Sequence, residues 1–107
     1  MKALQKITIN GKERNAILTL CLPAHAEKHN IDLKIPTHKM LSENPIAWLD
    51  SCVNAIYAGL LVGCEREGVQ PDFAKYDIEA WATENESEFI LIASELTQMF
   101  EFVLAIK

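Results

Sequence analysis

The chain contains little of what marks the special classes of protein. Its 107 residues include only four glycines, four prolines and three cysteines. So little glycine and proline excludes collagen-like and low-complexity sequence, and a hydrophobic fraction of 50% excludes intrinsic disorder. The length is that of one domain, so we expect residues 1–107 to form a single domain around one core.

Cysteine is too scarce, and odd in number, for a disulfide framework. The three cysteines are Cys21, Cys52 and Cys64, and residues 1–6 lack the apolar stretch of a secretory signal. We therefore expect reduced thiols and a cytoplasmic protein. The uncharged run at residues 51–64 is too short to span a bilayer, so no membrane is expected as a partner.

Positive charge is nearly missing from the larger part of the chain. Residues 45–107 contain three Lys or Arg and eleven Asp or Glu, whereas residues 1–44 contain seven and four. Contacts to phosphate need clustered Lys and Arg, so no nucleic acid is expected as a partner. An acidic surface of this kind is typical of a solvated face, or of one that meets a basic protein.

No arrangement of residues predicts catalysis. Cys52 and Cys64 lie in an apolar segment, where a thiol is usually an inert small hydrophobe. The carboxylates of Glu84, Glu86 and Glu88 cluster at an expected helix start, where the helix dipole favours them. No glycine-rich phosphate loop follows a predicted strand. We expect no enzymatic activity, no catalytic residue and no cofactor.

A weak metal-binding pattern is present near the N-terminus. Cys21, His25 and His29 are spaced four residues apart and would share one face of a continuous helix. Pro23 follows Cys21, however, and the fourth ligand would have to be His38 or a distant acid. We favour ordinary surface histidines, with a small metal- or thiol-dependent enzyme as an alternative.

Residues 6–20 predict a β-hairpin, because Asn10-Gly11 is a strong turn signal between strand-forming residues. A two-residue loop would place Ile7 opposite Arg14. A longer loop over residues 10–13 would place Ile7 opposite Ala16, with Leu18 on the same face. We favour the longer loop because it gathers apolar side chains on one face.

The rest of the chain predicts helices. We expect short helices over residues 22–30 and 77–84, the latter capped by Asp77, with residues 30–44 irregular. The central helix covers residues 45–66, capped by Asn44, and a final helix covers residues 86–106. The predicted fold is α+β, with the N-terminal hairpin packed on a bundle of three to four helices; the alternative is an all-α domain with the hairpin splayed off.

The central helix is apolar on nearly all sides, which indicates burial. Its two glycines, Gly59 and Gly63, have the spacing that lets another backbone come close. Because glycine inside a helix is unfavourable by about 1 kcal/mol relative to alanine, two of them indicate a tight contact. We expect that contact to lie inside the domain.

The final helix carries more apolar residues than one core face needs. One seam repeats every three or four residues, and further apolar side chains, including Phe102 and Leu104, lie mostly off that seam. Two interpretations stand at equal weight: a core helix buried on two sides, or an interaction surface. The second predicts these partner-binding residues: Phe89, Ile92, Leu96, Met99, Phe100 and Val103.

Several stretches together resemble one protein family. They are the hairpin at residues 7–13, Asn44-Pro45-Ile46, the helix Ala55-Ile-Tyr-Ala-Gly-Leu-Leu-Val-Gly-Cys64, and Pro71-Asp72-Phe73. A short helix holding Trp81 and an acidic, apolar final helix follow. This order, over residues 6–104, resembles the tail assembly chaperones of long-tailed bacteriophages and prophages.

The resemblance implies a small, non-enzymatic protein that is absent from the mature virion. Members bind the long tape-measure protein, keep it soluble and help recruit tail-tube subunits around it, and they tend to form homo-oligomers. The alternative is a small regulatory or antitoxin-like interaction module with one fixed partner, whose sequence would also show a surplus apolar helix.

Overall fold

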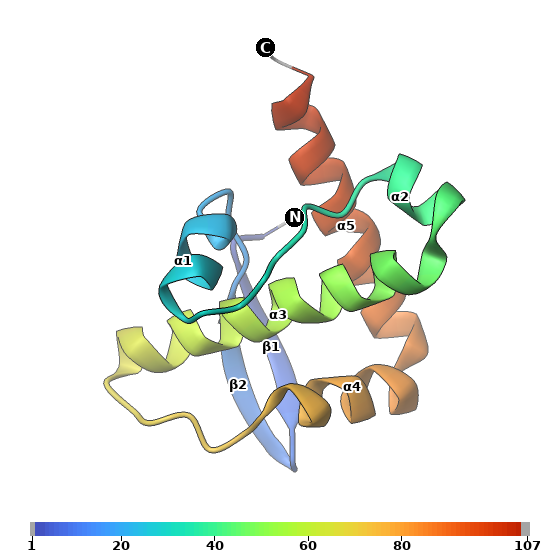
Figure 1. Ribbon diagram of the computed structural model, residues 1–107. Coiled ribbons are helices and arrows are strands. Elements are labelled where there is room, and N and C mark those ends of the chain that lie inside the picture. The colour runs from blue at the N-terminus through green and yellow to red at the C-terminus, as the bar shows by residue number, and fades with distance from the viewer. Residues whose placement is uncertain (1, 106–107) are drawn as a thin grey trace.

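A computed structural model describes residues 2–105, which form an N-terminal hairpin followed by five helices (Figure 1). The predicted α+β fold is confirmed. The elements are β1 (Leu4–Ile9), β2 (Lys12–Ile17), α1 (Leu22–Lys28), α2 (His38–Glu43), α3 (Pro45–Glu67), α4 (Lys75–Glu84) and α5 (Glu86–Leu104).

Helix α3 is the centre of the fold, and thirteen of its 23 residues are buried. Its start is fixed by Asn44, whose side chain accepts a hydrogen bond from the Ala47 N–H at 3.2 Å, and by Pro45 as the first helical residue. Its end is fixed by Gly68, which adopts the left-handed conformation with φ of 69°. Both ends were predicted to within one residue.

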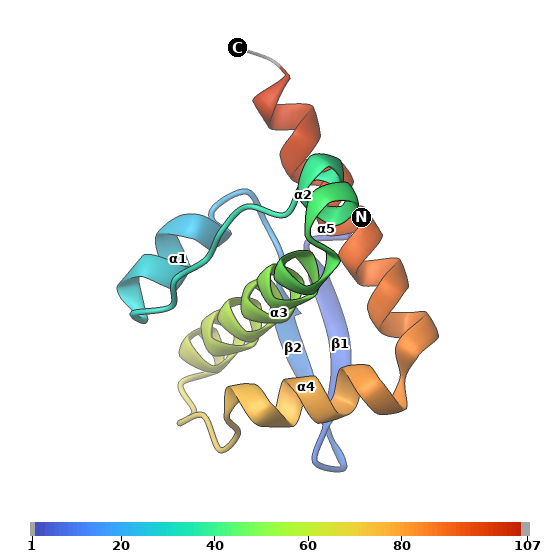
Figure 2. The same cartoon turned by 45° about the vertical axis from the view of Figure 1, so that its right-hand side comes forward.

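By length and composition alone α3 could cross a membrane, but 72% of its most apolar stretch is buried inside the protein. The other elements surround it on several sides (Figures 1 and 2). Its apolar character is therefore that of the core helix of a compact globule, as in soluble proteins.

The hairpin is held against the second half of α3 by a very close approach. A Cβ atom added at Gly59 would lie 2.5 Å from Leu18 Cδ2 and 2.9 Å from the Ile17 carbonyl oxygen, and one at Gly63 would overlap the Asn15 carbonyl oxygen. This confirms that the two glycines serve packing inside the domain. It also excludes the all-α alternative with a splayed hairpin.

The favoured hairpin register is wrong. Strands β1 and β2 are joined by the two-residue turn Asn10-Gly11, whose φ angles of 55° and 74° are positive, and Ile7 lies opposite Arg14. The second strand ends at Ile17 rather than at residue 20.

The physical reason lies with Arg14, whose side chain is only 9% exposed. Its guanidinium lies 4.9 Å from the centre of the Phe73 ring, forms an ion pair with Asp72, and donates from Nε to the Ile9 carbonyl oxygen at 3.1 Å. The hydrogen bond from Arg14 holds the pKa of Asp72 below its usual range. A charged residue can therefore occupy the apolar face, because Asp72 and Phe73 come back to it from far along the chain.

Three of the helix predictions need correction. The segment predicted as irregular contains α2, which begins where the Thr37 hydroxyl accepts a hydrogen bond from the Met40 N–H at 3.0 Å. Helix α1 ends at Lys28 instead of residue 30. Helix α4 begins at Lys75, two residues early, because Asp77 accepts from the Ala74 N–H at 2.8 Å from inside the first turn instead of capping the helix.

Helix α5 packs on both α3 and α4. The Trp48 indole N–H on α3 donates to the Thr97 hydroxyl oxygen at 3.0 Å, and the Trp81 ring on α4 meets the Phe89 ring edge-on with centroids 6.1 Å apart. The last turns of α5 extend beyond the rest of the molecule (Figures 1 and 2). The predicted end of this helix, residue 106, lies outside the described residues.

Candidate protein-interaction surface

The structure divides the predicted partner-binding seam of α5 into a buried part and an exposed part. Phe89, Ile92, Leu96 and Phe100 lie in the core, and none is more than 4% exposed. Met99 is half-buried and Val103 is 41% exposed. In this structure the first four side chains are buried inside the protein, so Met99 and Val103 are the members of the seam that a partner can reach.

Exposed apolar side chains gather instead on the last turns of α5. Val103 shares the helix face of Phe89, Leu96 and Phe100 by its spacing. It is uncovered because α5 has by then run past the body of the protein (Figure 2). We call the following residues the α5 tip: Met99, Phe102, Val103 and Leu104.

A shallow hollow of about 390 Å³ lies along the α5 tip. Phe102, Met99 and Val103 line it, together with Leu20 from the connection between β2 and α1. Phe102 is 69% exposed and Leu20 is 51% exposed. Such a cluster is apolar surface that the protein's own core does not use.

Sequence reasoning named only half of this surface. Phe102 and Leu104 were visible in the sequence as apolar residues off the seam. The signal for an interaction surface was that the final helix has more apolar residues than one core face needs. Leu20 could not be found in this way, since it reaches the α5 tip only through the path of the chain after β2.

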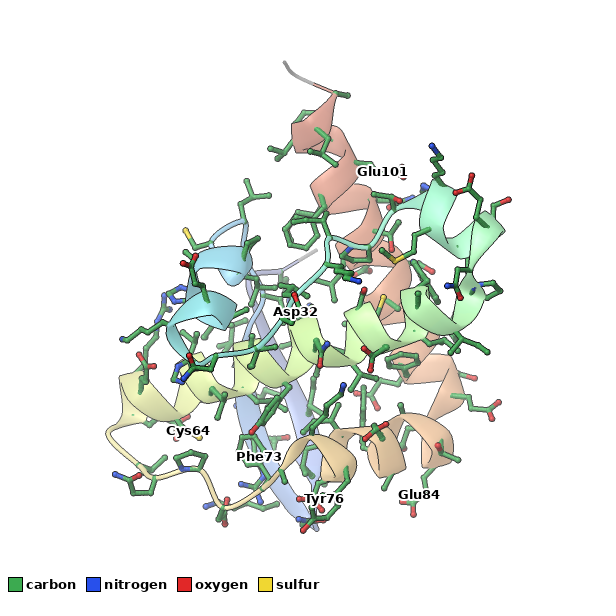
Figure 3. The ribbon with its side chains drawn as sticks, viewed as in Figure 1. Asp32, Cys64, Phe73, Tyr76, Glu84 and Glu101 are labelled. Carbon is green, nitrogen blue, oxygen red and sulfur yellow. The ribbon has the colours of Figure 1, made fainter. Side chains whose placement is uncertain are left out.

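The α5 tip is anchored at its base by α2. Glu101, labelled in Figure 3, lies on α5. Its carboxylate accepts hydrogen bonds from both the backbone N–H and the imidazole of His38, the first residue of α2. The bond from the His38 backbone, followed by that from its side chain, holds the pKa of Glu101 below its ordinary value. This link fixes α2 beside the projecting part of α5.

The weak metal-binding pattern does not form a site. Cys21 lies exposed at the start of α1, and the His29 ring is engaged by the Glu65 carboxylate on α3. Across residues 2–105, no three His, Cys, Asp or Glu side chains are grouped so that they could hold a metal ion.

The position of the other candidate cysteines and glutamates in the fold accounts for them without a chemical role. Cys52 is buried on α3, and burial raises the pKa of its thiol to about 12, so it stays protonated at neutral pH. Burial also raises the pKa of Cys64. Glu84 ends α4, while Glu86 and Glu88 occupy the first turn of α5, where the helix dipole stabilises them.

No protein-family model, curated protein or solved structure matches this chain.

Proposed function

We propose that this protein is a non-enzymatic tail assembly chaperone of a long-tailed phage or prophage. In this proposal it acts in the host cytoplasm and is absent from the mature virion. It binds the tape-measure protein, keeps it soluble and helps recruit tail-tube subunits. The family resemblance of the sequence motivates the assignment, and the single observation that carries it is the exposed α5 tip.

The α5 tip has the chemistry that a chaperone for a long helical client needs. Met99 and Phe102 have adaptable and large apolar side chains, which suit packing against a repetitive partner whose contacts vary along its length. The α5 tip and a helix of the client would pack side by side, and this would bury apolar surface that each of them exposes when unbound.

A chaperone must also keep its complex with the client soluble, and the charge of the same region supports this. The helices α4 and α5 carry acidic residues throughout, and residues 76–105 contain seven Asp or Glu and no Lys or Arg. A strongly negative surface keeps a complex with an aggregation-prone client in solution through mutual repulsion. We place the self-association of the protein on the α5 tip as well, so that client and second copy compete for it.

The test is a pull-down of tagged protein from its native host under prophage-inducing conditions, with bound proteins identified by mass spectrometry. We expect recovery of a very long, coiled-coil-rich protein, with or without a tail-tube subunit. Recovery of one small stable partner would instead support the regulatory or antitoxin-like alternative and contradict the chaperone assignment.

A matched pair of variants assigns the surface. Phe102→Asp places a charge on the α5 tip, whereas Tyr76→Asp does so on α4, and the two side chains are 69% and 71% exposed. We expect Phe102→Asp to lose the client and Tyr76→Asp to keep it. Substitution of Leu96 or Phe100 would not serve, because both side chains are buried and the change would unfold the protein.

A further inference from the structure

A second apolar surface lies at the other end of α5 from the tip. It is a groove of about 490 Å³, lined by residues from the first turns of α3, the last turns of α4 and the start of α5. The buried side chains of Val53 and Phe89 form part of its lining. Ile46 and Ile90, on α3 and α5, also line it and are 79% and 47% exposed. These are large apolar side chains that the fold leaves in contact with water.

The same groove is lined by carboxylates. Asp50, Glu79 and Glu86 come from α3, α4 and α5 respectively. Asp50 is bound by Lys75, with its Oδ1 atom 2.6 Å from Nζ. Within residues 2–105, neither Glu79 nor Glu86 has a cationic side chain within ion-pair distance. The groove therefore combines an apolar lining with two negative charges that form no ion pair within the part of the chain that the structure describes.

We propose that this groove binds an amphipathic helix of a partner protein that carries Lys or Arg beside its apolar face. The apolar side chains of such a helix would cover Ile46 and Ile90, and its cations would meet Glu79 and Glu86. Helix-in-groove docking of this kind places apolar anchors three or four residues apart, and complementary charge at the rim sets orientation and selectivity.

The charge of the groove argues against a second copy of this chain as the occupant. The amphipathic helix that a second copy could offer is α5. It carries the exposed Glu88 and the half-buried Glu95, and it has no Lys or Arg. Docking α5 into the groove would bring carboxylates against Glu79 and Glu86, which is unfavourable. The proposal goes beyond the assembly function and does not depend on the α5 tip.

The first experiment uses a fluorescent model peptide of leucine and lysine, about 14 residues long, patterned as an amphipathic helix of about 21 Å. Anisotropy titrations with the full chain measure its affinity. The controls are a scrambled peptide of the same composition and a leucine–glutamate peptide of the same pattern. We expect the patterned cationic peptide to bind and both controls to bind at least about tenfold more weakly.

The second experiment tests whether the peptide binds in the groove. We expect Ile46→Asp and Ile90→Asp each to weaken binding by about tenfold or more, the loss typical of a central contact. Leu91→Asp is the matched control, since Leu91 is 60% exposed on α5 but does not line the groove. We expect it to leave the affinity unchanged, with circular dichroism confirming that all three variants are folded.

Charge reversal supplies the decisive result. The double variant Glu79→Lys, Glu86→Lys should bind the cationic peptide more weakly than the original protein does, and it should bind the leucine–glutamate peptide more tightly. The proposal is overturned if the scrambled peptide binds as well as the patterned one, or if the Ile46 and Ile90 variants bind normally. It is also overturned if Phe102→Asp removes binding, because the peptide would then sit on the α5 tip. Failure of the Ile46 and Ile90 variants to weaken binding would leave the assignment of the tape-measure protein to the α5 tip untouched.

Discussion

Gly63 shows how one residue determines the distance between two elements. Its Cα lies so close to β2 that a methyl group would overlap the Asn15 carbonyl oxygen. In an open helix, replacing glycine by alanine would stabilise by up to about 1 kcal/mol. Here overpacking should dominate, so we expect Gly63→Ala to lower the free energy of unfolding by about 1–3 kcal/mol, measured by urea denaturation.

Gly68 provides the comparison for that measurement. Its surroundings are open, and the cost of Gly68→Ala comes only from the left-handed backbone, about 1–2 kcal/mol. Changing Gly68 to asparagine, which tolerates that conformation better, should recover part of this loss, whereas no larger residue should be accepted at Gly63. A Gly63→Ala protein as stable as the original would show that α3 and β2 are not so close in solution.

Thr97 is a second residue whose contribution can be isolated. It accepts a hydrogen bond from the Trp48 indole N–H and donates one to the Ala93 carbonyl oxygen at 2.8 Å, all inside the core. Thr97→Val keeps the shape but leaves the indole N–H unpaired, so we expect a loss of about 1–3 kcal/mol in thermal or urea unfolding.

Thr83 is the matched control for this substitution. It is exposed on α4, and its hydroxyl donates to the Glu79 carbonyl oxygen at 3.0 Å. Because water can replace that bond, Thr83→Val should change stability by no more than about 0.5 kcal/mol. Equal effects at the two positions would contradict the importance assigned to the buried Trp48–Thr97 pair.

At the scale of secondary structure, the link between α2 and α5 gives stability that depends on pH. His38 lowers the pKa of Glu101 in the folded protein below its ordinary value of 4.5. The folded state therefore binds fewer protons than the unfolded state as Glu101 titrates, so the contribution is full above that value and is lost as the pH falls through the folded pKa.

The variant Glu101→Gln tests this link. We expect it to be less stable than the original protein at pH 6, and the difference to shrink toward pH 3, in urea unfolding followed at both values. Hydrogen exchange should locate the loss in α2. Glu88→Gln, on the exposed face of α5, should show no such pH-dependent difference in α2. If Glu101→Gln were less stable than the original protein by the same amount at both pH values, Glu101 would act through packing alone.

The same scale shows what sequence patterns can and cannot predict. The bounds of α3 follow from Asn44, Pro45 and Gly68, because capping depends on neighbours in sequence. The hairpin register could not be obtained in this way: Arg14 looks like a surface residue until Asp72 and Phe73 come back to cover it. Helix α2 is too short for a periodic pattern, and its link to Glu101 joins residues 63 apart in sequence.

At the scale of the whole molecule, the sequence predicted that an apolar interaction surface exists on the final helix but not which residues form it. The surplus of apolar residues on the final helix was visible in the sequence. Which of them a partner can reach depends on where the body of the protein ends, and so Phe100 is buried while Phe102 is exposed. The groove was not foreseen either, because its lining comes from three helices that meet only in the folded state.

Self-association is the prediction that belongs to this scale. We expect the protein to form oligomers in sedimentation velocity experiments at micromolar concentration, through the α5 tip. Phe102→Asp should shift the distribution toward monomer by burying a charge in the apolar contact. Tyr76→Asp, with the same charge change on α4, should sediment as the original protein does. A Phe102→Asp protein that remains oligomeric would move the self-contact to another surface.

The dependence of the hairpin on α3 has a consequence for synthesis on the ribosome. The turn Asn10-Gly11 lets β1 and β2 pair within microseconds, yet the surface that covers β2 is completed only when α3 ends at Glu67. At about 5–20 residues per second, those 50 further residues take about 3 to 10 seconds. During that interval Ile7, Ile17 and Leu18 are uncovered in the nascent chain, and the hairpin waits for α3 as a short, two-stranded ribbon that is only marginally stable by itself.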